Sequence, residues 1–200
     1  RDQITIYCGM EVENYPSEWE DLKRYRSEMD YTILGQHTIL LDEDSAYRIN
    51  DPDGLRRYVE RIEDAAEKGL CDYIAHPDVV LYRYQNINDP AVLWAAERIA
   101  QVSLKYDLPL ELNCGSGIRN GKIRFESGYR YSYPTRVFFR EFARCHCPII
   151  IGMDVHNPKM FLTDEHLNLA LKEMEGLDLN YVQDYDLIGA AKKRKEFFRY

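Results

Sequence analysis

A carboxylate and an imidazole stand two residues apart directly after an apolar run, Ile149–Ile151, in the last third of the chain. These two side chains belong to Asp154 and His156. Side chains two apart in an extended segment point to the same side, so both are expected to reach one site. Carboxylate oxygens and imidazole nitrogens together form a ligand set for divalent metals.

Acids and imidazoles follow other short apolar segments in the same way. If these segments are parallel strands, their carboxyl ends open on one face, which is where such folds build active sites. The candidate metal ligands are Glu11, His37, His76, Asp154 and His156. Further polar residues at comparable positions are Glu13, Glu111 and Asn113.

Each candidate also has a purely structural interpretation. A lone histidine after a strand is commonly a hydrogen-bonded surface or core residue, and His76 before Pro77 fits a simple turn. Asp154 could cap the following segment, and Glu11 could be a solvated acid. The coincidence of several such residues at strand ends favours a shared metal site over these separate explanations.

The elements that must position these residues alternate between strand and helix. Alternation of this kind predicts an α/β fold with a parallel sheet and right-handed crossovers. Ser17, Asp53 and Asp89 are predicted at helix starts and Gly69 at a helix end. The predicted strands are 4–10, 30–37, 71–77, 108–114 and 148–154; the predicted helices are 17–29, 53–69, 89–107, 134–145, 163–176 and a basic, solvated 186–200. The remaining stretch, 114–133, is predicted to be a contact loop.

Bulk properties narrow the class of protein. The 200 residues fit one domain. A net charge of −8 disfavours general nucleic-acid binding, because phosphate contacts need Lys and Arg. No apolar run approaches the ~20 residues of a membrane span. Without a recognisable signal peptide, and with five cysteines, we expect a cytoplasmic protein with free thiols, although Cys145-His146-Cys147 is an alternative metal-binding stretch.

Five motifs in order resemble those of the PHP (polymerase and histidinol phosphatase) family, most closely its histidinol-phosphatase branch. The motifs are GMEVENY, ILGQH, YIAHPD, LELN and GMDVHNP, and together they span nearly the whole chain. The resemblance implies a distorted (β/α)7 barrel holding up to three divalent metals, usually Zn, Fe or Mn. It implies that Glu11 is a bridging carboxylate, that His37 and His76 are imidazole ligands, and that Asp154 and His156 close the site.

The chain departs from the family pattern in two respects. Met153 and Val155 stand where the family usually has Ser and Ala, which indicates altered packing around the ligands. The family's amino-terminal His-x-His and later Thr-Asp-His motifs do not occur in residues 1–200, so the chain corresponds to the carboxyl-terminal part of the barrel, without about two βα units. We expect either a piece of a longer polypeptide or a gapped barrel with a weakened site.

The resemblance also implies an activity, the hydrolysis of a small phosphomonoester such as histidinol phosphate, an intermediate of histidine biosynthesis, by a metal-bridging water. Asp154 is expected to orient that water or take its proton. Arg119, in the position of a phosphate-gripping arginine, is the expected substrate ligand. Tyr133, with Tyr129 and Tyr131, is expected to contact the organic part of the substrate.

Two other functions remain open. A degenerate or partial PHP domain could be a non-catalytic module for binding or assembly. A PHP phosphodiesterase or exonuclease would need a basic groove, and the only concentrated basic stretch, KKRK at 192–195, lies far along the sequence from the site residues. The oligomeric state is not determined by the sequence.

Overall fold

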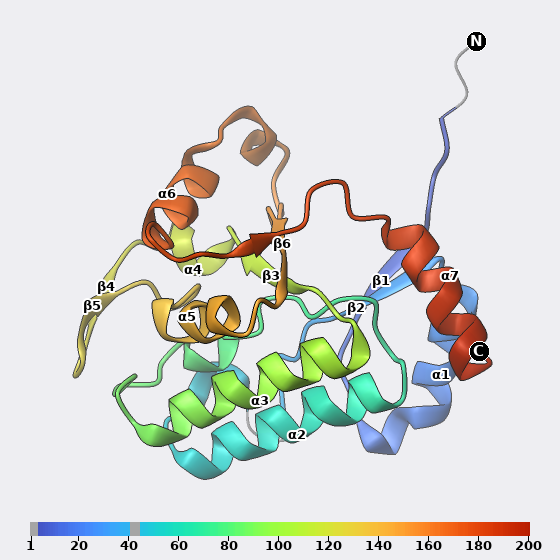
Figure 1. The fold of residues 1–200 in the computed structure, drawn as a ribbon, viewed down its shortest axis with the longest axis horizontal. Coiled ribbons are helices and arrows are strands. Elements are labelled where there is room, and N and C mark those ends of the chain that lie inside the picture. The colour runs from blue at the N-terminus through green and yellow to red at the C-terminus, as the bar shows by residue number, and fades with distance from the viewer. Residues whose placement is uncertain (1–3, 41–44) are drawn as a thin grey trace.

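Short parallel strands surrounded by helices make up the fold. The computed structural model describes residues 4–40 and 45–200 (Figure 1). The strands are β1 (Gly9–Val12), β2 (Tyr31–Leu34), β3 (Leu110–Asn113), β6 (Pro148–Gly152) and β7 (Asn180–Tyr181). β1 pairs with β2, β3 with β6, and β6 with β7, all in parallel. Ile74 bridges Leu34 of β2 to Leu110 of β3 and so joins the two groups.

The observed strands confirm the α/β class but not the closure of a barrel. Within the described ranges no bridge links β1 to β7, so the sheet is open at both edges. The predicted strand 71–77 is not formed: only Ile74 makes isolated β-bridges, and beyond it His76 has φ 31° and its carbonyl accepts a hydrogen bond from Val79 N that starts a turn. The predicted strand 4–10 is paired only from Gly9 onward.

Except for α4, which lies in the predicted loop 114–133, the helices occur where the sequence predicts them, with small shifts at their ends. They are α1 (Trp19–Glu28), α2 (Pro52–Glu67), α3 (Pro90–Tyr106), α4 (Ser116–Arg119), α5 (Arg136–Arg144), α6 (Glu165–Glu173) and α7 (Leu187–Phe198). The short 3-10 helices are η1 (Pro16–Glu18), η2 (Ala46–Arg48), η3 (Val79–Leu81) and η4 (Pro158–Leu162). No helix in the described ranges is both long and apolar enough to cross a bilayer.

The helix caps were predicted with mixed success. Asp89 accepts a hydrogen bond from Ala91 N and Pro90 is the first residue of α3, as predicted. Asp51, rather than Asp53, caps α2 by accepting from Gly54 N. Ser17 lies in η1 and caps nothing, because the 3-10 turn displaces the start of α1 to Trp19.

The core lies between the sheet and a layer of helices. In Figure 1, α2 and α3 run side by side beneath the strands, and α5 packs against α3. The inward face of α3 includes Val92, Ala95, Ala96 and Ile99, all completely buried. Small alanines at this face let neighbouring backbones approach closely, while the aliphatic residues supply the apolar area that stabilises the fold.

The stretch 114–133 is more ordered than a contact loop. It contains α4 and a hairpin of β4 (Ile123–Phe125) and β5 (Gly128–Arg130). The buried guanidinium of Arg130 donates hydrogen bonds to the carbonyls of Leu81, Tyr84, Tyr131 and Ser132. These four bonds connect the last residue of η3 and the segment after it to the residues that follow β5.

The carboxyl-terminal helix α7 is not simply a solvated element. Arg194 donates to the carbonyls of Tyr106 and Asp107, and its Nε lies 3.5 Å from Asp72 Oδ1. Lys195 donates to the carbonyl of Met29. The prediction of a solvated tail is therefore wrong for this face of α7, because its basic side chains satisfy carbonyls and a buried carboxylate at the edge of the core.

Candidate metal centre

Three of the five predicted ligands meet at the carboxyl ends of the first strands. Glu11 lies in β1, His37 follows β2, and His76 follows the bridging residue Ile74. One ligand atom from each residue lies within 4.8 Å of the others. We call Glu11, His37 and His76 the metal triad.

The distances within the metal triad suit a shared cation. Glu11 Oε1 lies 3.2 Å from His76 Nε2 and 3.6 Å from His37 Nε2, and the two imidazole centroids are 4.7 Å apart. One oxygen thus faces two ring nitrogens. Two imidazoles and a carboxylate form the donor set of many zinc and other transition-metal sites, so the residues fit a divalent metal.

Glu13 contacts His37, one member of the metal triad. Its Oε1 lies 3.5 Å from His37 Nδ1, which matches the common arrangement in which a carboxylate orients a metal-binding imidazole. Its Oε2 accepts hydrogen bonds from the backbone N–H groups of His37 and Thr38 and from the Tyr15 hydroxyl. Burial raises the pKa of Glu13, but the hydrogen bonds from His37, Tyr15 and Thr38 outweigh it and lower the pKa to about 2.

This depressed pKa makes a pH-dependent contribution to stability. The stabilisation is complete above the unfolded-state pKa of about 4.5 and is lost as the pH falls toward 2. In chelator-treated protein we expect Glu13→Gln to lower the free energy of unfolding by roughly 2–3 kcal/mol at pH 7. Urea unfolding should show a clearly smaller difference at pH 3.

The exposed Glu20 of α1 provides the control for this prediction, and Glu20→Gln should leave the unfolding free energy nearly unchanged at both pH values. An equal loss for Glu13→Gln at pH 7 and pH 3 would show that the carboxylate charge is not what stabilises this turn.

Glu111 positions His76. Its Oε2 accepts from the backbone N–H of His76 at 2.9 Å and from Asn113 Nδ2 at 3.0 Å. Burial raises the pKa of Glu111. Burial by itself would lower the pKa of His76, but the Glu11 hydrogen bond and the carboxylates of Glu111 and Asp154 raise it. His76 Nδ1 is buried and has no hydrogen-bond partner among the described residues.

Glycine keeps the space beside Glu11 open. A Cβ built on Gly35 would overlap the carboxylate oxygen of Glu11. We expect Gly35→Ala to leave the protein folded, because a side-chain end can move, but to weaken Mn²⁺ or Zn²⁺ binding by ~10-fold or more through misplacement of the ligand. Gly189→Ala is the matched control, since its Cβ would overlap the carboxylate of Asp186, a residue outside the metal triad. Equal metal affinities of the two variants by calorimetric titration would contradict the assignment.

Asp154 and His156 are not part of the metal triad. Asp154 is nevertheless close enough to raise the pKa of His76 and of Tyr47 electrostatically. His156 Nδ1 lies 3.2 Å from Asp154 Oδ1, and the His156 side chain is 71% exposed. The predicted alternation fails here because β6 ends at Gly152 and Asp154 has φ 46°, so the two residues do not continue an extended strand.

The predicted substrate residues have different environments. Arg119, exposed on α4, donates to Ser116 Oγ at 2.8 Å and contacts the sulfur of Met160. Tyr133 is buried, with its ring 6.2 Å from that of His76. Tyr129 is 71% exposed on β5, and no described contact ties it to the metal triad. Tyr131 is buried beneath the ammonium of Lys122.

Sequence reasoning missed the aromatic residues that border the metal triad. The ring of Tyr47 stacks on His37 with centroids 5.8 Å apart, and Tyr82 meets Tyr47 edge-on at 5.0 Å. Tyr82 also lies 6.1 Å from Tyr133. Neither tyrosine belongs to a strand or a periodic segment, so the sequence contains no signal that would have identified them.

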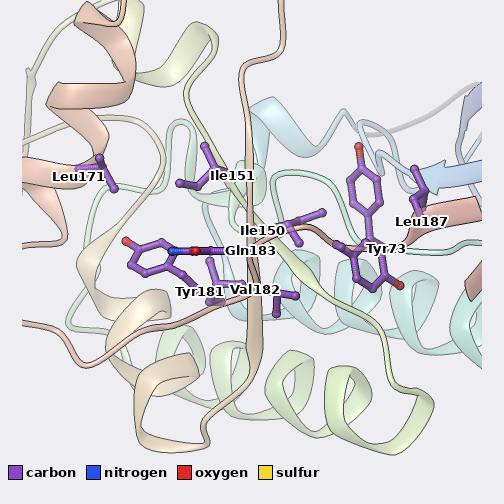
Figure 2. A pocket seen from close by; sticks show the side chains of 10 residues that line it. Tyr73, Ile150, Ile151, Leu171, Tyr181, Val182, Gln183 and Leu187 are labelled. Carbon is purple, nitrogen blue, oxygen red and sulfur yellow. The ribbon is translucent and has the colours of Figure 1, made fainter. Parts of the chain in front are cut away.

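A separate pocket of ≈ 580 Å³ lies along β6 and β7. Figure 2 shows its side chains, among them Tyr73, Ile150, Tyr181 and Leu187. None of the five candidate ligands lines it. Its lining is mainly apolar and aromatic and includes no acid or histidine.

Comparison with known proteins does not place the chain in a family. No family model matches it, and no curated protein matches it either.

Proposed function

We propose that the chain is a PHP-type domain and a metal-dependent phosphomonoester hydrolase of the histidinol-phosphatase type. The observation that carries the proposal is the convergence of Glu11, His37 and His76 within 4.8 Å. The motif resemblance supplies the reaction class. The substrate is a small phosphorylated metabolite, and histidinol phosphate is the compound that the resemblance suggests.

Each residue has a defined role in this proposal. Glu11, His37 and His76 hold the cation, with His37 oriented by Glu13 and His76 by Glu111. A bound divalent cation neutralises phosphoryl charge and lowers the pKa of water. The Asp154 carboxylate, whose Oδ1 lies 3.2 Å from His156 Nδ1, would accept the proton of the attacking water. The Arg119 guanidinium binds phosphoryl oxygens, for which a planar fork of N–H donors is well suited.

Metal analysis combined with an assay of p-nitrophenyl phosphate hydrolysis tests the proposal. Purified protein should bind Mn²⁺ or Zn²⁺ and release p-nitrophenol, and a chelator should abolish the release reversibly. Protein that binds the metal and yet hydrolyses neither this ester nor histidinol phosphate would refute the hydrolase.

A non-catalytic metal-binding module is the second candidate. The observation that favours it is the position of His156, which is exposed and lies outside the metal triad. The described residues therefore bring only three ligands together at the triad, without the predicted closing histidine. This candidate predicts metal binding without turnover. A nuclease is less well supported, because Arg194 and Lys195 of the basic stretch are engaged by carbonyls within the fold.

A further inference from the structure

A second pocket, of ≈ 390 Å³, includes Tyr47, whose ring stacks on His37 of the metal triad. It is lined by Tyr47, Arg48, Tyr82, Arg83, Ser116 and Asn120. Tyr47 of this pocket stacks on the ligand His37, and Tyr82 in turn contacts Tyr47. We call it the arginine pocket.

Three consecutive crossovers build the arginine pocket. Tyr47 and Arg48 come from η2 after β2, Tyr82 and Arg83 follow η3, and Ser116 begins α4 after β3. Each segment follows the carboxyl end of a β segment, the same end that carries the metal triad.

Hydrogen bonds fix these crossovers against one another. Asn50 Oδ1 accepts from Gln85 N at 2.8 Å and ties η2 to the chain after η3. Arg130 holds the carbonyls of Leu81 and Tyr84 on either side of Tyr82 and Arg83. The pocket is thus pre-formed, which reduces the entropy lost when a ligand binds.

The charge of the arginine pocket is opposite to that of the protein. The chain has a net charge of −8, and the carboxylates of Glu13 and Glu111 lie beside the metal triad. Arg48 and Arg83 are nevertheless both exposed at the pocket, and neither guanidinium has an ion-pair partner among the described residues. Arg119, proposed above to bind the phosphoryl group, lies at the rim of this pocket through its hydrogen bond to Ser116.

We propose that the arginine pocket binds a second anionic group of the substrate, so that the preferred phosphomonoester carries a carboxylate or a further phosphate on its organic part. This inference rests on the proposed function, because the phosphoryl group is taken to lie at the metal triad. Guanidinium groups pair bidentately with either anion. The same pair of charges disfavours a cationic organic part, so a phosphomonoester with an anionic organic part should be preferred over histidinol phosphate.

Binding of matched phosphonates to the full chain in Mn²⁺ tests this pocket without requiring turnover. The probes are benzylphosphonate and its para-carboxy, para-phosphonomethyl and para-aminomethyl derivatives, compared by calorimetric titration. We expect the carboxy or the phosphonomethyl probe to bind ~10- to 100-fold more tightly than benzylphosphonate, from one or two charge-assisted hydrogen bonds. The aminomethyl probe should bind more weakly than benzylphosphonate. Whichever anionic probe binds more tightly identifies the second group.

The double variant Arg48→Gln/Arg83→Gln should bring the affinity ratio of anionic to plain probe close to one. Arg140→Gln, at an exposed position of α5, should leave that affinity ratio unchanged. Equal affinities for all probes, or a preference that survives in the double variant, would overturn the assignment. Failure of the hydrolase proposal has a different signature, namely selective binding of the anionic probe with no hydrolysis of the corresponding phosphate ester.

Discussion

His76→Asn should lose metal binding almost completely while the protein stays folded. His76 supplies an Nε2 that lies 3.2 Å from Glu11 Oε1, in the buried part of the metal triad. Residues that only orient a metal ligand already contribute ~10- to 100-fold to affinity, so loss of a direct ligand is expected to cost at least ~100-fold. Asparagine is the chosen replacement because His76 has φ 31°, a left-handed conformation that asparagine tolerates.

His146→Asn is the matched control for this experiment. His146 also has positive φ, at 53°, and precedes β6 at the end of the sheet away from the metal triad. Competition with a chelating dye for Zn²⁺ or Mn²⁺ gives the affinities, and circular dichroism reports folding. Metal affinity that is unchanged in His76→Asn, or reduced equally in His146→Asn, would rule out the metal triad as the binding site.

Arg26→Met should cause the largest loss of stability of any single substitution on α1. Arg26 is completely buried, and its guanidinium donates to both carboxylate oxygens of Asp72 at 2.6 and 2.7 Å. It also donates to Thr32 Oγ1 and to the Gly69 carbonyl. Replacing Arg26 leaves the buried Asp72 carboxylate with only the longer contact to Arg194, at 3.5 Å. We therefore expect a loss of about 3 kcal/mol in unfolding free energy, at the lower end of what breaking a buried ion pair costs.

Urea unfolding of Arg26→Met beside Arg24→Met checks this expectation. Arg24 lies two residues away on the same helix and pairs with Asp21 and Glu28 in solvent, so its replacement should have little effect. The double variant Arg26→Met/Asp72→Asn should be less destabilised than the sum of its single variants, because the stranded charge is then absent. Similar losses for Arg24→Met and Arg26→Met would contradict the importance of burial.

The contrast between these two arginines shows what the sequence could not provide. Arg24 and Arg26 look equivalent in an amphipathic, charged helix. Only the packed structure places Asp72, 46 residues further along, beside Arg26 and not beside Arg24. Pairing over such a separation depends on how α1 packs against the sheet, and residue spacing contains no information about that.

The sequence likewise predicts some residues of the site correctly and misses others. Glu11, His37 and His76 could be grouped in advance, because each follows an apolar segment and parallel strands open on one face. His156 was placed by assuming that the extended chain continues past β6, and the positive φ of Asp154 ends that continuation. Tyr47 and the arginine pocket were not foreseen, since they lie on turns whose course depends on long-range hydrogen bonds such as Asn50 to Gln85.

The sequence by itself determined the alternation of strand and helix and the chemical character of the strand ends, because hydrophobic periodicity and residue type are local properties. The tertiary structure decided which of those strand ends meet, whether the sheet closes, and which charges are buried together. Those outcomes depend on crossover geometry and on packing between residues far apart in the chain. Glu11 and His76, separated by 65 positions and joined at 3.2 Å, show both contributions at one contact.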